Sequence, residues 1–412
     1  IMFRNLKVLM ICIFCSLGFM CNPATEWNSM FDRSSVVENS RGWVSGDAIR
    51  FTQLPNGKFM WIFGDSRVTR INTSNNTLII ENPFTKDSVF GNVIAIQESV
   101  PPNSQNIKFF ARDVVTEEVK DITSGLPSSF SQQGTSLQFF KESILNIPDI
   151  TPGSTEAIFW PHGLACVDCD GANPQVLVNL KETVFCNPQN SIYNCEPFCV
   201  LNNANNGENT SAEDCTSGLA SLRSMIVRVL NPNDPIESWI FQTVITEQDF
   251  SINWGVDFLE QGGWVYVYGT IEGEGPGERH LIVARTLHSN VMNPDEWEVF
   301  TENGWVKKIE NPTPKIAAKN VPTMLSVDSI ISNGRQNILL AHGLFGNHFT
   351  YLRTSGNPTV WEDINSKTAK VDKVSADFVL QESISFAIAN GNCNAPFLNI
   401  VTAVGNCMIS YH

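Results

Sequence analysis

Acidic side chains recur at one place in a repeated sequence pattern. Asp47, Asp257 and Asp328 each lie at or just before the first of two apolar segments that are joined by a turn. Two facing carboxyl groups can cleave a glycosidic bond, because one protonates the leaving oxygen while the other attacks the sugar or activates water. Crowded carboxylates also repel one another, so one of them can stay protonated near neutral pH and serve as the acid. We therefore predict that these three aspartates form a catalytic set. A structural role stays open for each, since an aspartate at a strand start often accepts hydrogen bonds from turn N–H groups.

Other side chains near the same segments could contact a sugar. A histidine can donate hydrogen bonds to hydroxyl groups or act as an acid, and an indole ring can stack on a sugar face. The alternatives are a structural histidine, a turn aspartate, and tryptophans that pack between sheets. The candidates for substrate binding are His162, Trp160, Asp65, Trp254 and Glu382.

The elements that must position these residues are short strands. A strand, a Gly/Asn turn and a second strand recur five times, and the apolar runs are rich in Val, Ile, Phe and Trp. Repeated units of this kind, separated by long connections, are typical of a β-propeller, in which one position of each repeat faces a central channel. We therefore predict an all-β fold, a five-bladed β-propeller. The copies lie at residues 46–66, 162–178, 255–269, 326–340 and 383–401.

The first residues have the pattern of an export signal. Arg4 and Lys7 precede an apolar run at residues 8–15. A short basic segment before such a run is typical of a secretory signal peptide, and the run is too short to span a bilayer comfortably. We predict a signal peptide at residues 1–21, a mature propeller domain at residues 22–412 and an extracellular location, with no transmembrane segment.

Cysteine usage agrees with export. Eight cysteines follow the leader, and an even number in an exported chain indicates disulfides. We predict that Cys393 pairs with Cys407, since they flank a hairpin-like segment. The others are expected to pair among themselves and to staple an Asn/Cys-rich insertion at residues 187–218. Zinc binding at residues 166–169 is the less favoured alternative, because no histidine pair lies nearby. These cysteines are Cys166, Cys169, Cys186, Cys195, Cys199 and Cys215.

Three sequons in polar segments predict N-glycosylation of an exported chain, at Asn72, Asn75 and Asn209. No phosphate-binding loop, nucleophile elbow or metal-ligand spacing is present. Ca²⁺ is compatible with this many carboxylates, but no spacing requires it, so neither a metal nor another cofactor is predicted.

The charge balance restricts the partners. The formal net charge of -15 argues against nucleic acid, whose phosphates need Lys and Arg, and against an anionic membrane surface. The partner that fits the predicted site is a carbohydrate. Self-assembly or an extracellular protein partner is the alternative.

Several short motifs together resemble a known family. They are residues 46–66, 159–161, 266–270, 283–285 and 409–411, and they are similar to the domain-of-unknown-function 4185 family. The resemblance covers most of the mature chain. It implies a five-bladed propeller related to glycoside hydrolase families 43, 32 and 117, some members of the family being endo-D-arabinofuranases. It also implies that Asp47 corresponds to the acidic residue of the family's first blade.

The chain departs from this family at two places. His162-Gly163 stands where related chains carry Gly-Asp, and residues 389–391 stand where they often carry His-Pro. The retained Asp47 and Asp257 favour a secreted glycoside hydrolase acting on a furanoside or similar polysaccharide. In that function Asp47 is the base or nucleophile and a second carboxyl group is the acid. The departures favour the alternative, a non-catalytic protein that binds glycan or builds an extracellular assembly.

Overall fold

The computed structural model describes the chain in segments, which contain β-strands and short 3₁₀ helices but no α-helix. The described residues are 41–45, 50–64, 66–72, 79–80, 89–90, 92–98, 107–112, 118–123, 139–140, 157–186, 218–247, 252–273, 279–321, 325–332, 335–344, 348–354, 357–359, 362–363, 378–381, 399–402 and 409–410. The predicted signal peptide at residues 1–21 and most of the predicted insertion lie outside them. No helix in the described part is long and apolar enough to cross a membrane.

The first two main sheets are antiparallel meanders, in which each strand pairs with the next one along the sheet path. The first has the order β2-β3-β7-β8-β9, formed by Arg50–Gln53, Phe59–Phe63, Val93–Gln97, Ile107–Arg112 and Val119–Asp121. The second has the order β10-β11-β12-β13, formed by Ala157–Val167, Gln175–Cys186, Gly218–Val229 and Phe241–Glu247.

The next two sheets follow the same plan. The third has the order β14-β15-β16-β17-β18, formed by Ile252–Gln261, Trp264–Glu272, Arg279–Leu287, Glu298–Thr301 and Gly304–Lys307, and β19 at Ala318–Val321 pairs with β16. The fourth has the order β20-β21-β22-β23, formed by Leu325–Ser332, Arg335–Leu344, His348–Thr354 and Glu362–Asp363.

Shorter elements complete the described part. Strands β24, β25 and β26 form one sheet, at Phe378–Gln381, Asn399–Thr402 and Ile409–Ser410. Strands β1, β4, β5 and β6 form another, at Arg41–Ser45, Ser66–Asn72, Ile79–Ile80 and Val89–Phe90. The 3₁₀ helices η3 to η6 span Ile236–Ser238, His288–Asn290, Pro294–Glu296 and Lys308–Glu310.

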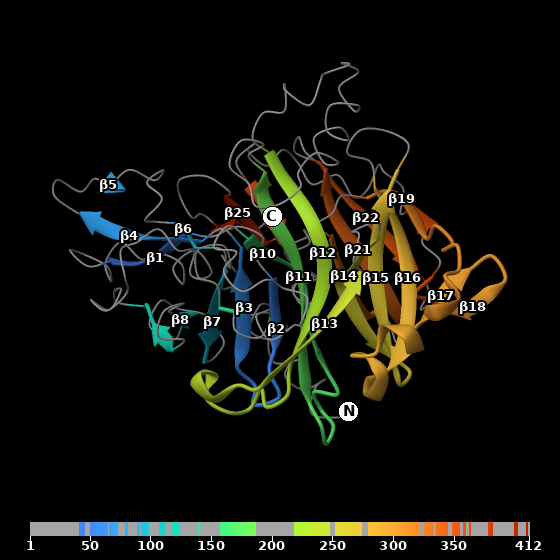
Figure 1. Ribbon diagram of the computed structural model, residues 1–412, viewed down its shortest axis with the longest axis horizontal. Helices are drawn as coiled ribbons and strands as arrows, with labels where there is room; N and C mark the ends of the chain where they lie inside the picture. Colours follow the sequence, from blue (N-terminus) through green and yellow to red (C-terminus); the bar gives the residue numbers. More distant parts are fainter. Residues whose placement is uncertain are drawn as a thin grey trace, which may run out of the picture.

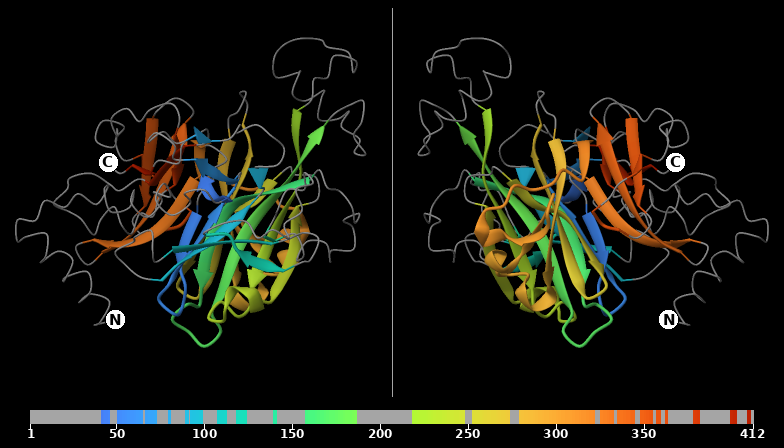
Figure 2. Two further views of the ribbon diagram at one scale, coloured as in Figure 1. Left: turned by 90° about the vertical axis from the view of Figure 1, so that its left-hand side faces the viewer. Right: turned by 90° about the vertical axis from the view of Figure 1, so that its right-hand side faces the viewer.

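The first strands of consecutive sheets lie against one another. β2 contacts β10, β10 contacts β14, and β14 contacts β20. Figures 1 and 2 show the sheets following one another in chain order, from blue through green and yellow to orange. Meanders that pack face to face with their first strands innermost form a β-propeller. The predicted all-β propeller is therefore confirmed, while the count of five blades stays a prediction.

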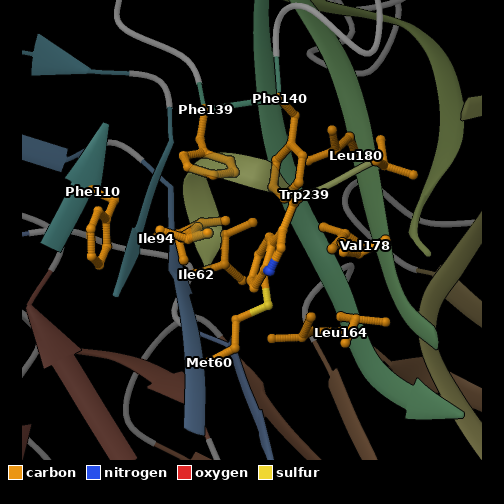
Figure 3. Packing of buried hydrophobic residues seen from close by; sticks show 14 of the residues in the cluster. Met60, Ile62, Ile94, Phe110, Phe139, Phe140, Leu164, Val178, Leu180 and Trp239 are labelled. Atoms are coloured by element: carbon orange, nitrogen blue, oxygen red, sulfur yellow. The ribbon is translucent and has the colours of Figure 1, made fainter. Parts of the chain in front are cut away.

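Aliphatic and aromatic side chains fill the space between neighbouring sheets. β11 has apolar residues on both of its faces: Val176 and Val178 face the first sheet, and Leu177 faces the third. This explains why residues 176–178 form a continuous apolar run rather than an alternating one. Figure 3 shows the cluster between the first two sheets, with Trp239 lying between Ile62 and Val178. Burying each such side chain contributes about 1.5–3 kcal/mol.

The turns have the chemistry that the sequence predicts. Gly262 and Gly263 join β14 to β15 with φ of 61° and 81°. Positive φ at both central residues is the geometry of the two-residue hairpin turn that matches strand twist, and glycine adopts it without steric cost. The segment 187–217 connects β11 to β12, whose ends are paired at Cys186 and Gly218.

Candidate functional site

Polar side chains from three innermost strands come together in the protein interior. Arg50 lies on β2, His162 on β10, and Asn253 and Asp257 on β14. Their side chains are buried, with relative exposures of 3%, 4%, 2% and 5%. We call these four residues the polar centre.

Two bulges and one glycine allow the innermost strands to approach closely at this level. The register of β10 shifts between Pro161 and Leu164, and that of β14 shifts between Trp254 and Asp257. A Cβ atom on Gly163 would lie 2.1 Å from the carbonyl oxygen of Gly255 and 3.1 Å from the Cα of Asp257. The bulges and the missing side chain therefore bring His162 and Asp257 onto adjoining backbone.

Arg50 ties the first sheet to the second. Its Nε donates a hydrogen bond to the main-chain carbonyl of His162. Burial lowers the pKa of Arg50, and the carboxylate of Asp257 raises it. The guanidinium and that carboxylate therefore interact within a buried environment, where charges act on each other strongly.

Asp257 ties the third sheet to the fourth. Its Oδ1 accepts a hydrogen bond of 2.9 Å from the N–H of Phe258, and its Oδ2 accepts one of 2.6 Å from the N–H of Val327. Hydrogen bonds from N–H groups favour the ionised carboxylate. The residue opposite it on β15 is Tyr268, whose pKa is raised well above its usual value by burial and then by Asp257 and Tyr266. Tyr268 is therefore a neutral phenol.

The structure places only some of the residues predicted from the sequence. Asp47, Asp65 and Glu382 lie outside the described residues. The backbone of Asp328 lies in β20, opposite Leu339, and its side chain is not described. The predicted convergence of the three aspartates therefore stays a prediction, while His162 and Asp257 are brought together.

The two predicted tryptophans differ in their surroundings. Trp254 is fully buried and packs edge-on against Trp297, with ring centroids 6.1 Å apart and an angle of 85°. Such a ring is a core residue, and in this conformation it offers no face to a ligand. Trp160 is half-buried and lies opposite Lys181 on β11.

Sequence reasoning missed Arg50 and Asn253 as members of the site. Asn253 stands beside apolar residues in β14, and that contrast was the available signal for it, whereas Arg50 lies in the largely polar strand β2 and has no such signal. Their partner, His162, is 112 residues away from Arg50 and 91 residues away from Asn253 along the chain. Pairing over such separations leaves no local pattern.

Cys166 and Cys169 form a disulfide, with Cα atoms 5.7 Å apart. This agrees with local pairing among the cysteines of that region and corrects the zinc alternative at residues 166–169. Within the described ranges no group of His, Cys, Asp and Glu could hold a metal ion. Asn72 ends β4, and its side chain is not described. The other predicted cysteines and sequons lie outside the described side chains, namely Cys186, Cys195, Cys199, Cys215, Cys393, Cys407, Asn75 and Asn209.

The chain matches a domain of unknown function, DUF5005, over residues 28–369. This protein belongs to the DUF5005 family. The finer resemblance to the domain-of-unknown-function 4185 family stays a prediction. No curated protein matches the chain in sequence.

Solved structures with a similar fold include a "putative hydrolase" from Bacteroides ovatus. It has a TM-score of 0.51 and 15% sequence identity, over 93% of this chain and 84% of the other. Weaker similarity reaches the α-L-arabinanase of Cellvibrio cellulosa complexed with arabinohexaose, with a TM-score of 0.34 and 10% identity over 81% of this chain and 100% of the other. It also reaches the β-fructofuranosidase catalytic domain of Microbacterium saccharophilum, with a TM-score of 0.38 and 10% identity over 82% and 66%. At these identities the similarity concerns the fold alone.

Proposed function

We propose that this DUF5005 protein is an exported, glycoside-hydrolase-like propeller that acts on a polysaccharide. The observation that carries the proposal is the polar centre. Arg50, His162 and Asp257 come from the innermost strands of three consecutive sheets. In a propeller the innermost strands line the central channel, so side chains on them can meet a ligand at its mouth.

The surroundings of Asp257 suit it to act as an ionised carboxylate. Its carboxylate, held by two N–H groups, is suited to act as a base, as a nucleophile or as a stabiliser of positive charge on the sugar. It is less suited to protonate a leaving group. The acid would then be Asp47, Asp328 or His162. Asp47 precedes Arg50 by three residues, and Asp328 follows Val327, the residue whose N–H binds Asp257.

A second function stays open because of the same two hydrogen bonds. Both oxygens of Asp257 bind the main chain, and one of these bonds crosses to β20. This arrangement suits a residue that holds two sheets together. It favours a non-catalytic protein that binds glycan or builds an extracellular assembly.

A polysaccharide panel separates the two functions. Because the chain carries a net charge of -15, neutral polysaccharides are the first choice, and arabinans, galactans and fructans with free ends form a suitable set. The purified full chain is incubated with each, and the release of reducing sugar is measured. We expect release from one class of furanoside, and its loss by at least about 100-fold in Asp47→Asn, as for the removal of a catalytic acid or base.

The control is Asp295→Asn, which changes an exposed aspartate on η5. It should release sugar as the unaltered protein does. If Asp47→Asn releases as much sugar as the unaltered protein, Asp47 is not a catalytic residue. No release from any polysaccharide, together with retention of the protein on one of them, would replace the hydrolase by the glycan-binding function.

A further inference from the structure

Trp160 and Lys181 are neighbours on one face of the second sheet. They lie opposite each other on β10 and β11, and side chains paired in this way have Cβ atoms about 4.5–5.5 Å apart. Alternate residues of a strand point to the same side, so Lys181 faces the third sheet, as Leu177 does. Trp160 and Lys181 are both half-buried, so part of each side chain reaches the surface.

The third sheet, which lies beside the second in Figure 1, adds further basic groups at the same end. Arg279 begins β16 and lies opposite Glu272, with Nη1 of the arginine 3.1 Å from Oε1 of the glutamate. The charges of both residues act on Lys181, besides its other interactions. His280 shares with Ile282 the face of β16 that packs toward the second sheet. Its Nδ1 is buried and has no hydrogen-bond partner within the described part of the chain.

The positive charge of Lys181 lies in an unfavourable setting. Burial and, after it, the charge of Arg279 lower the pKa of Lys181 to about 8, although Glu272 acts in the opposite direction. Two cations that disfavour each other in a partly desolvated place are both favoured by a bound anion. Titratable groups with such surroundings are typical of binding sites. The guanidinium of Arg279 also has the planar set of N–H donors that matches the two oxygens of a carboxylate.

We propose that Trp160, Lys181 and Arg279 form a subsite for an acidic sugar, at the place where the second and third sheets meet. The carboxylate of the sugar binds Lys181 and Arg279, and the sugar ring packs on the indole of Trp160. Trp160 precedes His162 by two residues on β10, so this subsite adjoins the polar centre.

The subsite narrows the substrate class. The net charge of -15 disfavours a polyanion, whereas the local charges of Lys181 and Arg279 favour one carboxylate. The substrate is therefore a largely neutral polysaccharide that bears single uronic acid residues. Cleavage of such a chain rests on the proposed function, whereas binding of the acidic sugar does not.

Binding of matched methyl glycosides to the full chain tests the subsite. The probes are the methyl glycosides of galacturonic and glucuronic acid, each beside its neutral counterpart from galactose or glucose. Each pair differs only in having a carboxylate in place of a hydroxymethyl group. Titration followed by NMR should show one of the acids binding at least about 10-fold more tightly than its neutral counterpart, as for hydrogen bonds to a charged group.

Lys181→Met is the informative variant, and Lys307→Met is its control at a side chain that is 41% exposed. The preference for the acid should be lost in Lys181→Met and kept in Lys307→Met. Lys181→Arg, which retains the charge, should keep most of the preference. Arg279→Gln should weaken binding of the acid and leave binding of the neutral glycoside unchanged.

The ionisation of Lys181 provides a second readout. A carboxylate beside the amine favours its charged form, so the acid should raise the pKa of Lys181 from about 8, while the neutral glycoside should not change it. NMR of the chain labelled with ¹³C-lysine follows this titration, and the signal of Lys181 is identified by its absence from Lys181→Arg. A lysine with a purely structural role would show no shift.

Equal binding of acid and neutral glycosides by the unaltered protein would overturn the proposal. A preference that survives in Lys181→Met would do the same. If the acid binds as expected but the polysaccharide panel yields no sugar, only the proposed hydrolase function fails. If sugar is released while no acid is preferred, only the subsite fails.

Discussion

Asp257 combines two roles that a sequence cannot separate. Its position at the start of a repeat predicts a catalytic carboxylate, and the same position suits an acceptor for turn N–H groups. In the structure it does accept two main-chain hydrogen bonds, one of them from Val327 on a different sheet. When Asp257 is replaced, the effect on activity therefore has to be separated from the effect on stability.

We predict that Asp257→Asn lowers the free energy of unfolding by about 1–3 kcal/mol. An asparagine keeps one acceptor but turns an NH₂ group toward the other main-chain N–H, which leaves a buried donor unsatisfied. The measurement is urea unfolding followed by circular dichroism, with Asp295→Asn as the exposed control. An unchanged midpoint would mean that the two hydrogen bonds contribute nothing to the fold.

Lys181 is a lysine in an unfavourable setting. Burial and, after it, the charge of Arg279 lower its pKa to about 8, although Glu272 acts in the opposite direction. Because the folded chain holds this proton more weakly, the unfolded chain binds more protons between about pH 8 and the ordinary lysine pKa of 10.5. The contribution of Lys181 to the free energy of unfolding therefore rises with pH across that window.

We predict that Lys181→Met is more stable than the unaltered protein at pH 7 and that the difference shrinks between about pH 8 and 10.5. The substitution removes a charge whose burial is unfavourable. Urea midpoints measured from pH 7 to 10.5 provide the check, with Lys307→Met as a control at a side chain that is 41% exposed. A stability difference that does not vary with pH would contradict the assigned cause.

At the scale of elements, the contact between β10 and β14 sets the geometry of the site. Bulges in both strands and the missing side chain at Gly163 bring the two backbones together. The strand segments and their turns could be predicted, because period and turn chemistry are local properties of the sequence. The bulges could not, since they depend on which strand lies alongside.

We predict that Gly163→Ala lowers the free energy of unfolding by about 3 kcal/mol, the upper end of the usual cost of overpacking. The added Cβ would meet main-chain atoms of β14, which cannot move without breaking strand pairing. Gly262→Ala is the control, because its Cβ would meet open space and only its φ of 61° is unfavourable. It should cost about 1 kcal/mol. Equal costs for the two variants would show that the close approach does not limit this position.

At the scale of the whole molecule, consecutive sheets are joined through their innermost strands and through apolar clusters between their faces. The five repeats predict a closed ring of five blades, in which the last sheet must return to the first. Cys393 belongs to the last repeat and Cys407 follows it, so their pairing would stabilise that end of the chain.

We predict that Cys393 and Cys407 form a disulfide when the protein is exported through an oxidising compartment. The cross-link would close a loop of 15 residues. For a loop of this length it is expected to raise the free energy of unfolding by about 3 kcal/mol. Non-reducing peptide mapping by mass spectrometry decides, and the Cys166–Cys169 disulfide provides an internal reference. Free thiols at Cys393 and Cys407, with Cys166–Cys169 intact, would contradict the prediction.

The sequence by itself determined the all-β class, the strand and turn segments, and the preference for a propeller. These follow from apolar runs, turn residues and their repetition, which are all short-range features. It also pointed to Asp257 and His162, because each stands beside a repeated segment. What it left open was whether each candidate faces a ligand or the core, as Trp254 illustrates.

Only the tertiary structure decided which side chains meet. Arg50 binds His162 across 112 residues, Asn253 meets His162 across 91, and Asp257 binds Val327 across 70. Each contact joins a different pair of sheets, so it depends on how the sheets pack and on bulges that shift the register. Contacts between residues so far apart in the chain produce no local sequence pattern. The polar centre can therefore be recognised only in the folded structure.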